Sequence, residues 1–281
     1  MTKPTFIGIG AQKCATTWIH DVLTDHPDIY LSDKKEVNFF AHKYIYGLQW
    51  YLDQFPQTRN KTDAVGEFST LYFYDEQAPK RIKSVFPDIK LLLALREPVD
   101  RLISNHRHEV RIGHISGPDL SVEAGIKNNP TYIEQGMYAT QLQHWLEYFP
   151  LEQIHIILFD DIKSNPKQVV NDLYEFLQVN PHIFASKSEI KSNPSYVNRS
   201  AMVESIRKKT YCTFKSLGLE GIWNIARKAG LQKVYRNLNR QSSETVIPPA
   251  DTKTKTELKY IFSDDVKDLE KLLNRNLDDW K

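Results

Sequence analysis

Several features that point to particular classes of protein are scarce or missing in this sequence. Its 281 residues include two cysteines, too few for a disulfide framework or a cysteine-rich zinc site. No apolar run approaches the roughly 20 residues needed to cross a bilayer. The beginning of the chain lacks the basic and then apolar pattern of a signal peptide. The formal net charge is +2, which gives no general affinity for nucleic acid or other polyanions. We therefore expect a soluble, cytoplasmic protein without a nucleic-acid partner.

The chain does contain enough apolar material for a folded core. Hydrophobic residues make up 41% of the sequence and include 13 Phe, 14 Tyr and 5 Trp, which excludes a wholly disordered chain. The length suits one α/β domain. We expect a single domain over residues 1–281.

Short apolar segments alternate with amphipathic ones along most of the chain. This alternation predicts an α/β, P-loop-like three-layer fold with a central parallel sheet flanked by helices. Ligands bind at the carboxyl ends of the strands in such sheets. The predicted strands are residues 6–9, the segment around Val65, and residues 91–95 and 154–159. The predicted helices begin near Thr16, at Glu76, Pro98, Tyr138 and Pro166, and, for the last one, at Asp264.

A basic segment interrupts this pattern in the second half of the chain. Between Ala201 and Arg240, nine Lys or Arg residues face two acidic ones, Glu204 and Glu220, and apolar residues recur at helical spacing. We interpret residues 201–245 as a basic helical insertion. Two roles stay open: a surface for an anionic acceptor or for peripheral contact with an acidic membrane, or a solvated helix that packs its apolar side on the core.

The first strand leads into a loop of small and polar residues, Gly10-Ala11-Gln12-Lys13-Cys14-Ala15-Thr16-Thr17. Small residues let backbone N–H groups approach an anion, and the helix that follows adds the positive end of its dipole. Lys13 adds a full charge, and the two threonines offer hydroxyls that bind the anion or cap the helix. The loop is therefore a candidate phosphate site, although a tight turn with an exposed lysine fits the same residues.

The loop differs from two common nucleotide-binding motifs. It lacks the Gly-Lys-Ser/Thr ending of a Walker A loop, and Lys13 occupies the place of the third glycine in a dinucleotide fingerprint. These differences disfavour hydrolysis of a nucleoside triphosphate. A small-molecule kinase with a degenerate loop stays open as an alternative.

A second candidate anion site follows the central strand. Arg96 stands at the end of that strand, where its guanidinium can donate two hydrogen bonds to phosphate. Pro98 fixes the start of the next helix, and Ser104 lies two turns along it. A salt bridge between Arg96 and Glu97 is the alternative. Two strand-end sites in one sheet suggest a ligand with two anionic groups.

Together the two segments resemble the phosphate-binding signatures of sulfotransferases that use 3′-phosphoadenosine 5′-phosphosulfate (PAPS). The stretch Glu36-Val37-Asn38-Phe39-Phe40, residues 47–51, residues 136–138 and the ending Leu277-Asp278-Asp279-Trp280 resemble heparan-sulfate-type sulfotransferases and their bacterial relatives. The similarity covers most of the chain and is poorest at residues 201–240.

The resemblance implies a role for each matching residue. The first loop is expected to hold the 5′-phosphosulfate, with Lys13 at the leaving phosphate, and Arg96 and Ser104 to hold the 3′-phosphate. Glu36 is expected to act as general base on the acceptor, and His108, one turn after Ser104 and preferred over His106, to assist. The product is adenosine 3′,5′-bisphosphate (PAP), and no metal is required. The full set of expected donor-binding residues is Gln12, Lys13, Cys14, Ala15, Thr16, Thr17, Arg96, Ser104 and, from a late basic loop, Arg199.

Two positions depart from the family pattern. Many relatives have lysine where this chain has Phe68, so the second active-site lysine of those enzymes is missing. That keeps open a nucleotide-binding module without catalysis. Relatives usually have glycine at Ala15, where alanine costs little if its φ is negative. The expected acceptor is a hydroxyl, less readily an amine, of a carbohydrate or other small molecule.

Overall fold

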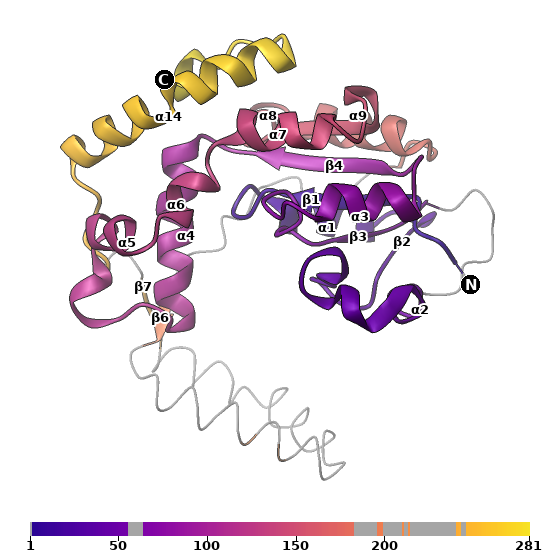
Figure 1. Ribbon diagram of the computed structural model, residues 1–281, viewed down its shortest axis with the longest axis horizontal. Helices are drawn as coiled ribbons and strands as arrows, with labels where there is room; N and C mark the ends of the chain where they lie inside the picture. The colour runs from indigo at the N-terminus through magenta and orange to yellow at the C-terminus, as the bar shows by residue number, and fades with distance from the viewer. Residues whose placement is uncertain are drawn as a thin grey trace. The chain divides into compact units, whose positions relative to one another are not determined.

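The computed structural model describes residues 2–55, 64–182, 196–198, 210, 213, 240–242 and 246–281 (Figure 1). The chain divides into two compact units. The first contains Met1–Leu102, Ile133–Lys191 and Thr256–Lys281. The second contains Ile103–Tyr132 and Ser192–Lys255. The basic insertion expected at residues 201–245 falls almost wholly outside the described residues and stays a prediction.

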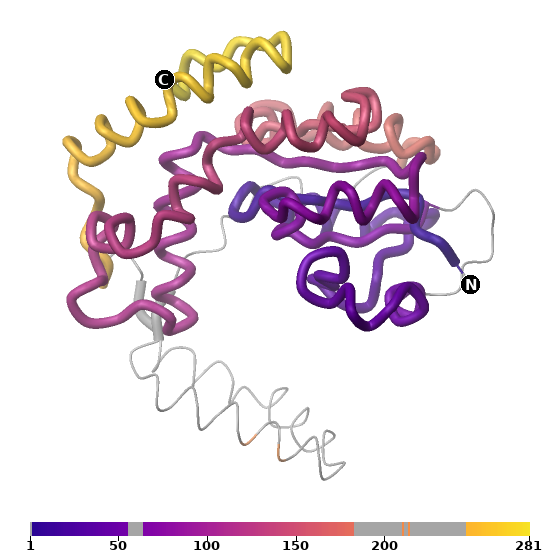
Figure 2. Tube along the Cα trace, viewed as in Figure 1, coloured from indigo at the N-terminus to yellow at the C-terminus, as the bar shows by residue number. Residues whose placement is uncertain are grey.

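The first unit is built on a five-stranded sheet in the order β2-β3-β1-β4-β5, in which every pair of neighbours is parallel. All five strands come from the first 158 residues of the chain (Figure 2). The predicted α/β fold with a parallel sheet is thus confirmed. The strands are β1 Phe6–Gly10, β2 Ile29–Leu31, β3 Ala64–Phe68, β4 Lys90–Leu95 and β5 Ile154–Leu158.

Differences in burial explain why the central strands could be predicted from the sequence and the edge strand β2 could not. Every residue of β1 and β3 is buried, as is every residue of β4 after Lys90, because helices cover both faces of the sheet. The edge strand β2 has three residues, and Ile29 alone is buried among them. A strand of three residues is too short to show a hydrophobic pattern in the sequence.

Helices cover the sheet, and Figure 1 draws α7, α8 and α9 above β4, and α1 and α3 below it. Most helices begin where the sequence predicted. The strand β5 ends at Leu158, one residue earlier than expected, because Phe159 already belongs to a helix. The helices of this unit include α1 Thr16–Thr24, α2 Gly47–Leu52, α3 Ala78–Val85, α7 Tyr138–Leu146, α8 Phe159–Ser164 and α9 Pro166–Leu177, with a π-helical segment at Phe39–Lys43. The division between the units falls within α6 (Thr131–Glu134).

The last long helix, α14, runs over Thr252–Leu273 and starts well before the predicted Asp264. The Asp265 carboxylate of α14 accepts hydrogen bonds from the backbone N–H of Ala139 (2.9 Å) and Thr140 (3.0 Å). It also accepts one from the Thr140 hydroxyl (2.9 Å). These N–H groups belong to the first turn of α7, where a helix has no internal acceptors. A residue distant in sequence thus caps α7.

The second unit contains most of α4 (Pro98–Ile112), α5 (Val122–Asn128) and an antiparallel pair, β6 (Tyr196–Asn198) and β7 (Arg240–Ser242). His106 is buried here, and its ring nitrogens contact the Leu120 carbonyl (3.0 Å) and the Tyr132 hydroxyl (3.4 Å). None of the helices in the described part of the chain combines the length and the apolar character that a membrane span needs.

Candidate active site

Polar loops follow the carboxyl ends of four strands of the parallel sheet. The loop 10–15 follows β1, and residues 32–38 follow β2. Ser69 and Thr70 follow β3, and Arg96 follows β4. Because the strands are parallel, these four segments meet at one edge of the sheet. The predicted position of the site is therefore consistent with the topology.

The loop after β1 has a backbone shape that suits an anion. Lys13 (φ 73°) and Ala15 (φ 64°) both have left-handed conformations, and residues of this kind turn successive N–H groups inward as a concave nest. Gly10 is needed for close approach, because a Cβ there would come within 2.7 Å of the Phe73 Cβ. The condition under which alanine at position 15 would cost little, a negative φ, is not met. Alanine occupies a glycine-like conformation there, at a cost of roughly 1 kcal/mol.

The side chains of this loop differ in what they can offer a ligand. Cys14 is buried, and burial raises the pKa of its thiol to about 11, so it stays neutral and can contribute only its backbone. Thr16 is also buried, whereas Thr17 is exposed. The residue before α1 is Ala15, and no side chain caps the helix there. Capping by a threonine was therefore a wrong expectation, and the first N–H groups of α1 have no side-chain cap.

Arg96 has a defined environment at the end of β4. Its Nη2 donates to the Asp100 carboxylate (2.9 Å), and its guanidinium lies 4.7 Å from the centre of the Phe159 ring. The buried Nε has no hydrogen-bond partner among the described residues. Since a buried donor without a partner is costly, this atom is suited to an incoming phosphate oxygen.

The alternative contact of Arg96, a salt bridge to Glu97, is not formed. The Glu97 carboxylate instead accepts hydrogen bonds from the backbone N–H of Val99 (3.0 Å) and Asp100 (2.6 Å) at the start of α4. Burial raises the pKa of Glu97, and these two hydrogen bonds oppose that rise. The strand end is held on its other side by Tyr138, whose hydroxyl donates to the Arg96 carbonyl (3.0 Å).

The expected base, Glu36, contacts the loop that follows β3. Its Oε1 accepts a hydrogen bond from the Thr70 hydroxyl at 2.7 Å. The aromatic pair Phe39 and Phe40, which the sequence placed near this carboxylate, belongs to the core and packs on Tyr51. Thr70 therefore gives Glu36 its direct polar contact.

A second carboxylate, Glu67, was missed in the sequence. It is fully buried in β3 and accepts hydrogen bonds from Ser69 Oγ (2.5 Å), Tyr72 (2.8 Å) and Tyr51 (3.3 Å). Burial raises the pKa of Glu67 to about 7, and the three hydrogen bonds oppose the rise. Ser69 Oγ also accepts from the backbone N–H of Asn38 (2.8 Å). This buried cluster thus fixes the segment that carries Glu36. An acidic residue inside an apolar strand was the signal that could have revealed it.

Three expected site residues belong to the second unit or lie outside the described chain. Ser104 and His108 are partly exposed on α4, four residues apart, and the ring Nδ1 of His108 contacts Arg111 Nη2 at 2.6 Å. Burial of His106 agrees with the preference for His108, which stays a prediction. Arg199 lies outside the described residues, so its role also stays a prediction.

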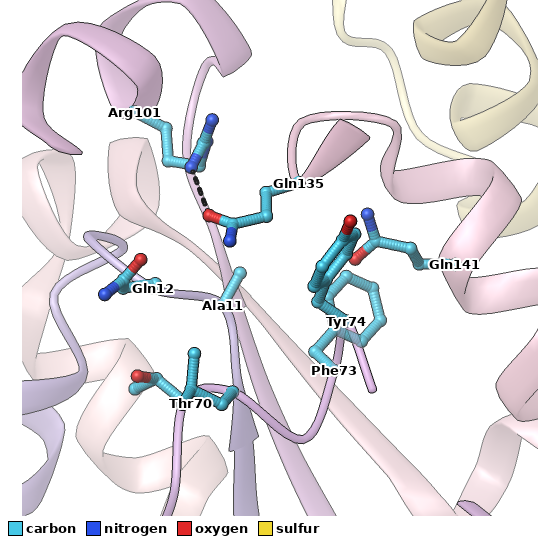
Figure 3. A pocket seen from close by; sticks show the side chains of 9 residues that line it. Ala11, Gln12, Thr70, Phe73, Tyr74, Arg101, Gln135 and Gln141 are labelled. Atoms are coloured by element: carbon cyan, nitrogen blue, oxygen red, sulfur yellow. Dashed lines mark hydrogen bonds between the residues drawn. The ribbon is translucent and has the colours of Figure 1, made fainter. Parts of the chain in front are cut away.

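A small hollow, open to solvent, borders the loop 10–15 (Figure 3). Arg101 on its wall donates to Gln135 Oε1 at 3.2 Å. Thr70 lines this hollow, and its hydroxyl donates to the Glu36 carboxylate. Its lining is Ala11, Gln12, Thr70, Leu71, Phe73, Tyr74, Arg101, Gln135 and Gln141. In the described ranges, no group of three or more His, Cys, Asp or Glu side chains is arranged to hold a metal ion.

Comparison with known proteins agrees with this geometry. The sulfotransferase domain family matches residues 3–245, so the chain belongs to that family. It is 31% identical over 97% of its length to mouse bifunctional heparan sulfate N-deacetylase/N-sulfotransferase 4, and 29% identical over 97% to human enzyme 3 of the same name. The chain spans about 30% of the length of these relatives.

A solved structure shows the same fold. The crystal structure of a sulfotransferase from Alicyclobacillus acidocaldarius has a TM-score of 0.69 and 25% sequence identity, covering 100% of this chain and 99% of that one. The resemblance inferred from the two loops is thereby confirmed at the level of the family, and the enzyme class is that of a sulfotransferase.

Proposed function

We propose that this chain transfers a sulfonate group from PAPS to an amine or hydroxyl of a carbohydrate. The observation that carries the proposal is the meeting, at one sheet edge, of a phosphate loop with Lys13, the unpartnered Nε of Arg96, and Glu36 held by Thr70. Bound PAPS supplies an activated sulfonate, and the residues of the chain bind it and manage the charges.

Each residue has a separate task in this reaction. The nest at Lys13 and Ala15 binds the 5′-phosphosulfate, and the Lys13 ammonium neutralises the phosphate oxygen that leaves. Arg96 binds the 3′-phosphate, which fixes the orientation of the nucleotide. Glu36 takes the proton from the acceptor as its nitrogen or oxygen bonds to sulfur, and Thr70 orients the carboxylate for that step.

The hollow beside Thr70 supports a polar acceptor. Its amides, Gln12, Gln135 and Gln141, offer both donors and acceptors, and Tyr74 offers an aromatic face, a combination suited to a sugar. The names of the relatives, which are heparan sulfate N-sulfotransferases, support an amine alongside the hydroxyl favoured from the sequence.

The test uses labelled PAPS with two matched heparosan oligosaccharides, one with free glucosamine amines and one fully N-acetylated. Transfer to the first alone identifies an amine acceptor, and transfer to both identifies a hydroxyl. Glu36→Gln should lower the rate about 100- to 10,000-fold with PAP binding nearly unchanged, because the general base is lost while the donor site is intact. Binding of ATP with magnesium, but not of PAP, would contradict the proposal.

A further inference from the structure

A second ammonium group lies next to the phosphate loop. Lys35 directly precedes Glu36 in the segment after β2, and its Nζ donates to the Thr16 carbonyl at 2.9 Å. Thr16 is the first residue of α1 and immediately follows the loop. The Lys35 side chain therefore extends from the segment after β2 to the first residue of α1, next to the loop 10–15.

The Phe68 ring holds Lys35 from the other side. The Lys35 Nζ lies 5.4 Å from the centre of that ring, a cation–π distance. The ring has little freedom, because it covers Gly8, where a Cβ would come within 2.1 Å of it, and meets the Phe6 ring edge-on. The last side chain of β3 is thus a rigid platform for an ammonium that comes from a different loop.

The charges around Lys35 leave it open to an anion. Its contacts are a carbonyl and a ring, while Glu36 and Asp21 act on it through their charge. Burial lowers the pKa of Lys35 to about 8, more than these two carboxylates raise it. His20 also faces the group, and burial together with the charge of Lys35 lowers the pKa of that imidazole. A sulfonate oxygen would place a negative charge in direct contact with the Lys35 ammonium.

We propose that Lys35 is a catalytic residue that binds a non-bridging oxygen of the sulfonate, with Phe68 as its support. This inference rests on the proposed function. In the transfer, a bond forms from the acceptor nitrogen or oxygen to sulfur, and the bond from sulfur to the bridging oxygen breaks. Its electron pair goes to the 5′-phosphate beside Lys13, and the acceptor proton goes to Glu36. Lys35 keeps its proton throughout, and its charge stabilises the sulfonate oxygens.

The placement also explains the missing lysine at position 68. A lysine there would extend from the end of β3 on the same face as the Phe68 ring, over Gly8. In this chain the ammonium of Lys35 lies over that same ring. The positive charge comes from residue 35 in place of residue 68, so the binding-module alternative raised by Phe68 loses its basis.

The experiment compares the binding of PAPS and PAP, which differ by the sulfonate, through calorimetric titration. Lys35→Met should weaken PAPS binding about tenfold and leave PAP binding within twofold, while Lys34→Met, at the preceding residue of the same exposed stretch, should change neither. Lys35→Arg should keep the PAPS preference because it keeps the charge. Adding Phe68→Lys to the Lys35→Met protein should restore at least part of the preference for PAPS over PAP.

The pH dependence of kcat/KM gives a second readout. For the wild type, kcat/KM should fall as pH rises past about 8, as the Lys35 ammonium loses its proton. Lys35→Arg should move this fall to higher pH. If wild type binds both nucleotides and Lys35→Met binds PAPS equally well, the Lys35 inference is wrong. If wild type binds neither nucleotide, the proposed function itself fails.

Discussion

The ends of β1 and β3 are adjacent in the sheet, yet they are built from different kinds of contact. The end of β1 continues without interruption into the loop 10–15 and the first turn of α1, and the backbone of this one segment forms the candidate anion nest. The end of β3 depends on side-chain contacts, two of which join segments apart in the sequence: Tyr51 donates to Glu67, and Thr70 donates to Glu36. A site formed by consecutive residues can be predicted from the sequence. A site formed by residues that are far apart in the chain cannot.

The strongest test of this comparison removes the one full charge of the β1 loop. Lys13→Ala should lower kcat about 1000-fold, because the leaving phosphate loses its nearest cation while the backbone nest stays. Initial rates with labelled PAPS measure this, and Lys80→Ala, an exposed lysine on α3, is the control. A loss below tenfold would place the leaving group elsewhere.

At the end of β3, the matching test concerns stability. The pKa of Glu67 is raised to about 7 in the folded chain, above the ordinary value of 4.5. The folded state therefore holds a proton that the unfolded state has lost, and the free energy of unfolding falls as pH rises from about 4.5 to about 7. The total change is about 3 kcal/mol.

Glu67→Gln should remove this dependence. Urea denaturation at pH 5, 6, 7 and 8 gives the difference between wild type and variant, which cancels the titration of other groups. Wild type should lose stability relative to the variant up to about pH 7, and the difference should then level off. A constant difference across the series would mean that Glu67 titrates normally.

Loss of the proposed nucleotide contact after β4 should have a smaller effect. Arg96→Ala should weaken PAP binding by about 1.5–3 kcal/mol, because charge-assisted hydrogen bonds are lost. Asp100→Asn is the informative partner, since it removes the carboxylate that competes for Arg96 and should not weaken binding. Calorimetric titration measures both. Unchanged PAP affinity in Arg96→Ala would overturn the assignment of the 3′-phosphate site.

The smallest expected effect is a gain in stability at the β1 loop. Ala15→Gly should raise the free energy of unfolding by about 0.5–1 kcal/mol, because glycine relieves the left-handed φ of 64°. Ala124→Gly, inside α5, should lower it by about 1 kcal/mol. Urea denaturation curves compare the two variants. If both lose stability equally, Ala15 is not strained.

The sequence predicted the parts of the site that depend on neighbouring residues. The loop before Thr16, the strand ending at Leu95 and the helix starting at Pro98 were all correct, because turns and proline act within a few residues. The sequence did not reveal the φ of Ala15 or the partners of Glu67. A backbone φ and the hydroxyls that contact a buried carboxylate depend on the folded geometry, which the hydrophobic pattern of the sequence does not report.

Lys35 shows the same limit. In the sequence it is one of two consecutive lysines, and nothing local distinguishes it from Lys34. The fold brings its ammonium to the Thr16 carbonyl and the Phe68 ring, across three separate segments. The structure is therefore needed to see that the Lys35 ammonium lies where relatives with a lysine at position 68 would place theirs.

The hydrogen bonds between Asp265 and the first turn of α7 have a consequence for truncated versions of this protein. Asp265 holds the backbone at Ala139, next to Tyr138, and Tyr138 in turn holds the carbonyl of Arg96. A chain cut before Asp265 keeps every residue of the sheet and of the loop 10–15. It loses the hydrogen bonds that hold the backbone next to Tyr138, which contacts Arg96, the residue proposed to bind the nucleotide. Trimming from this end should therefore reduce nucleotide affinity before it unfolds the sheet.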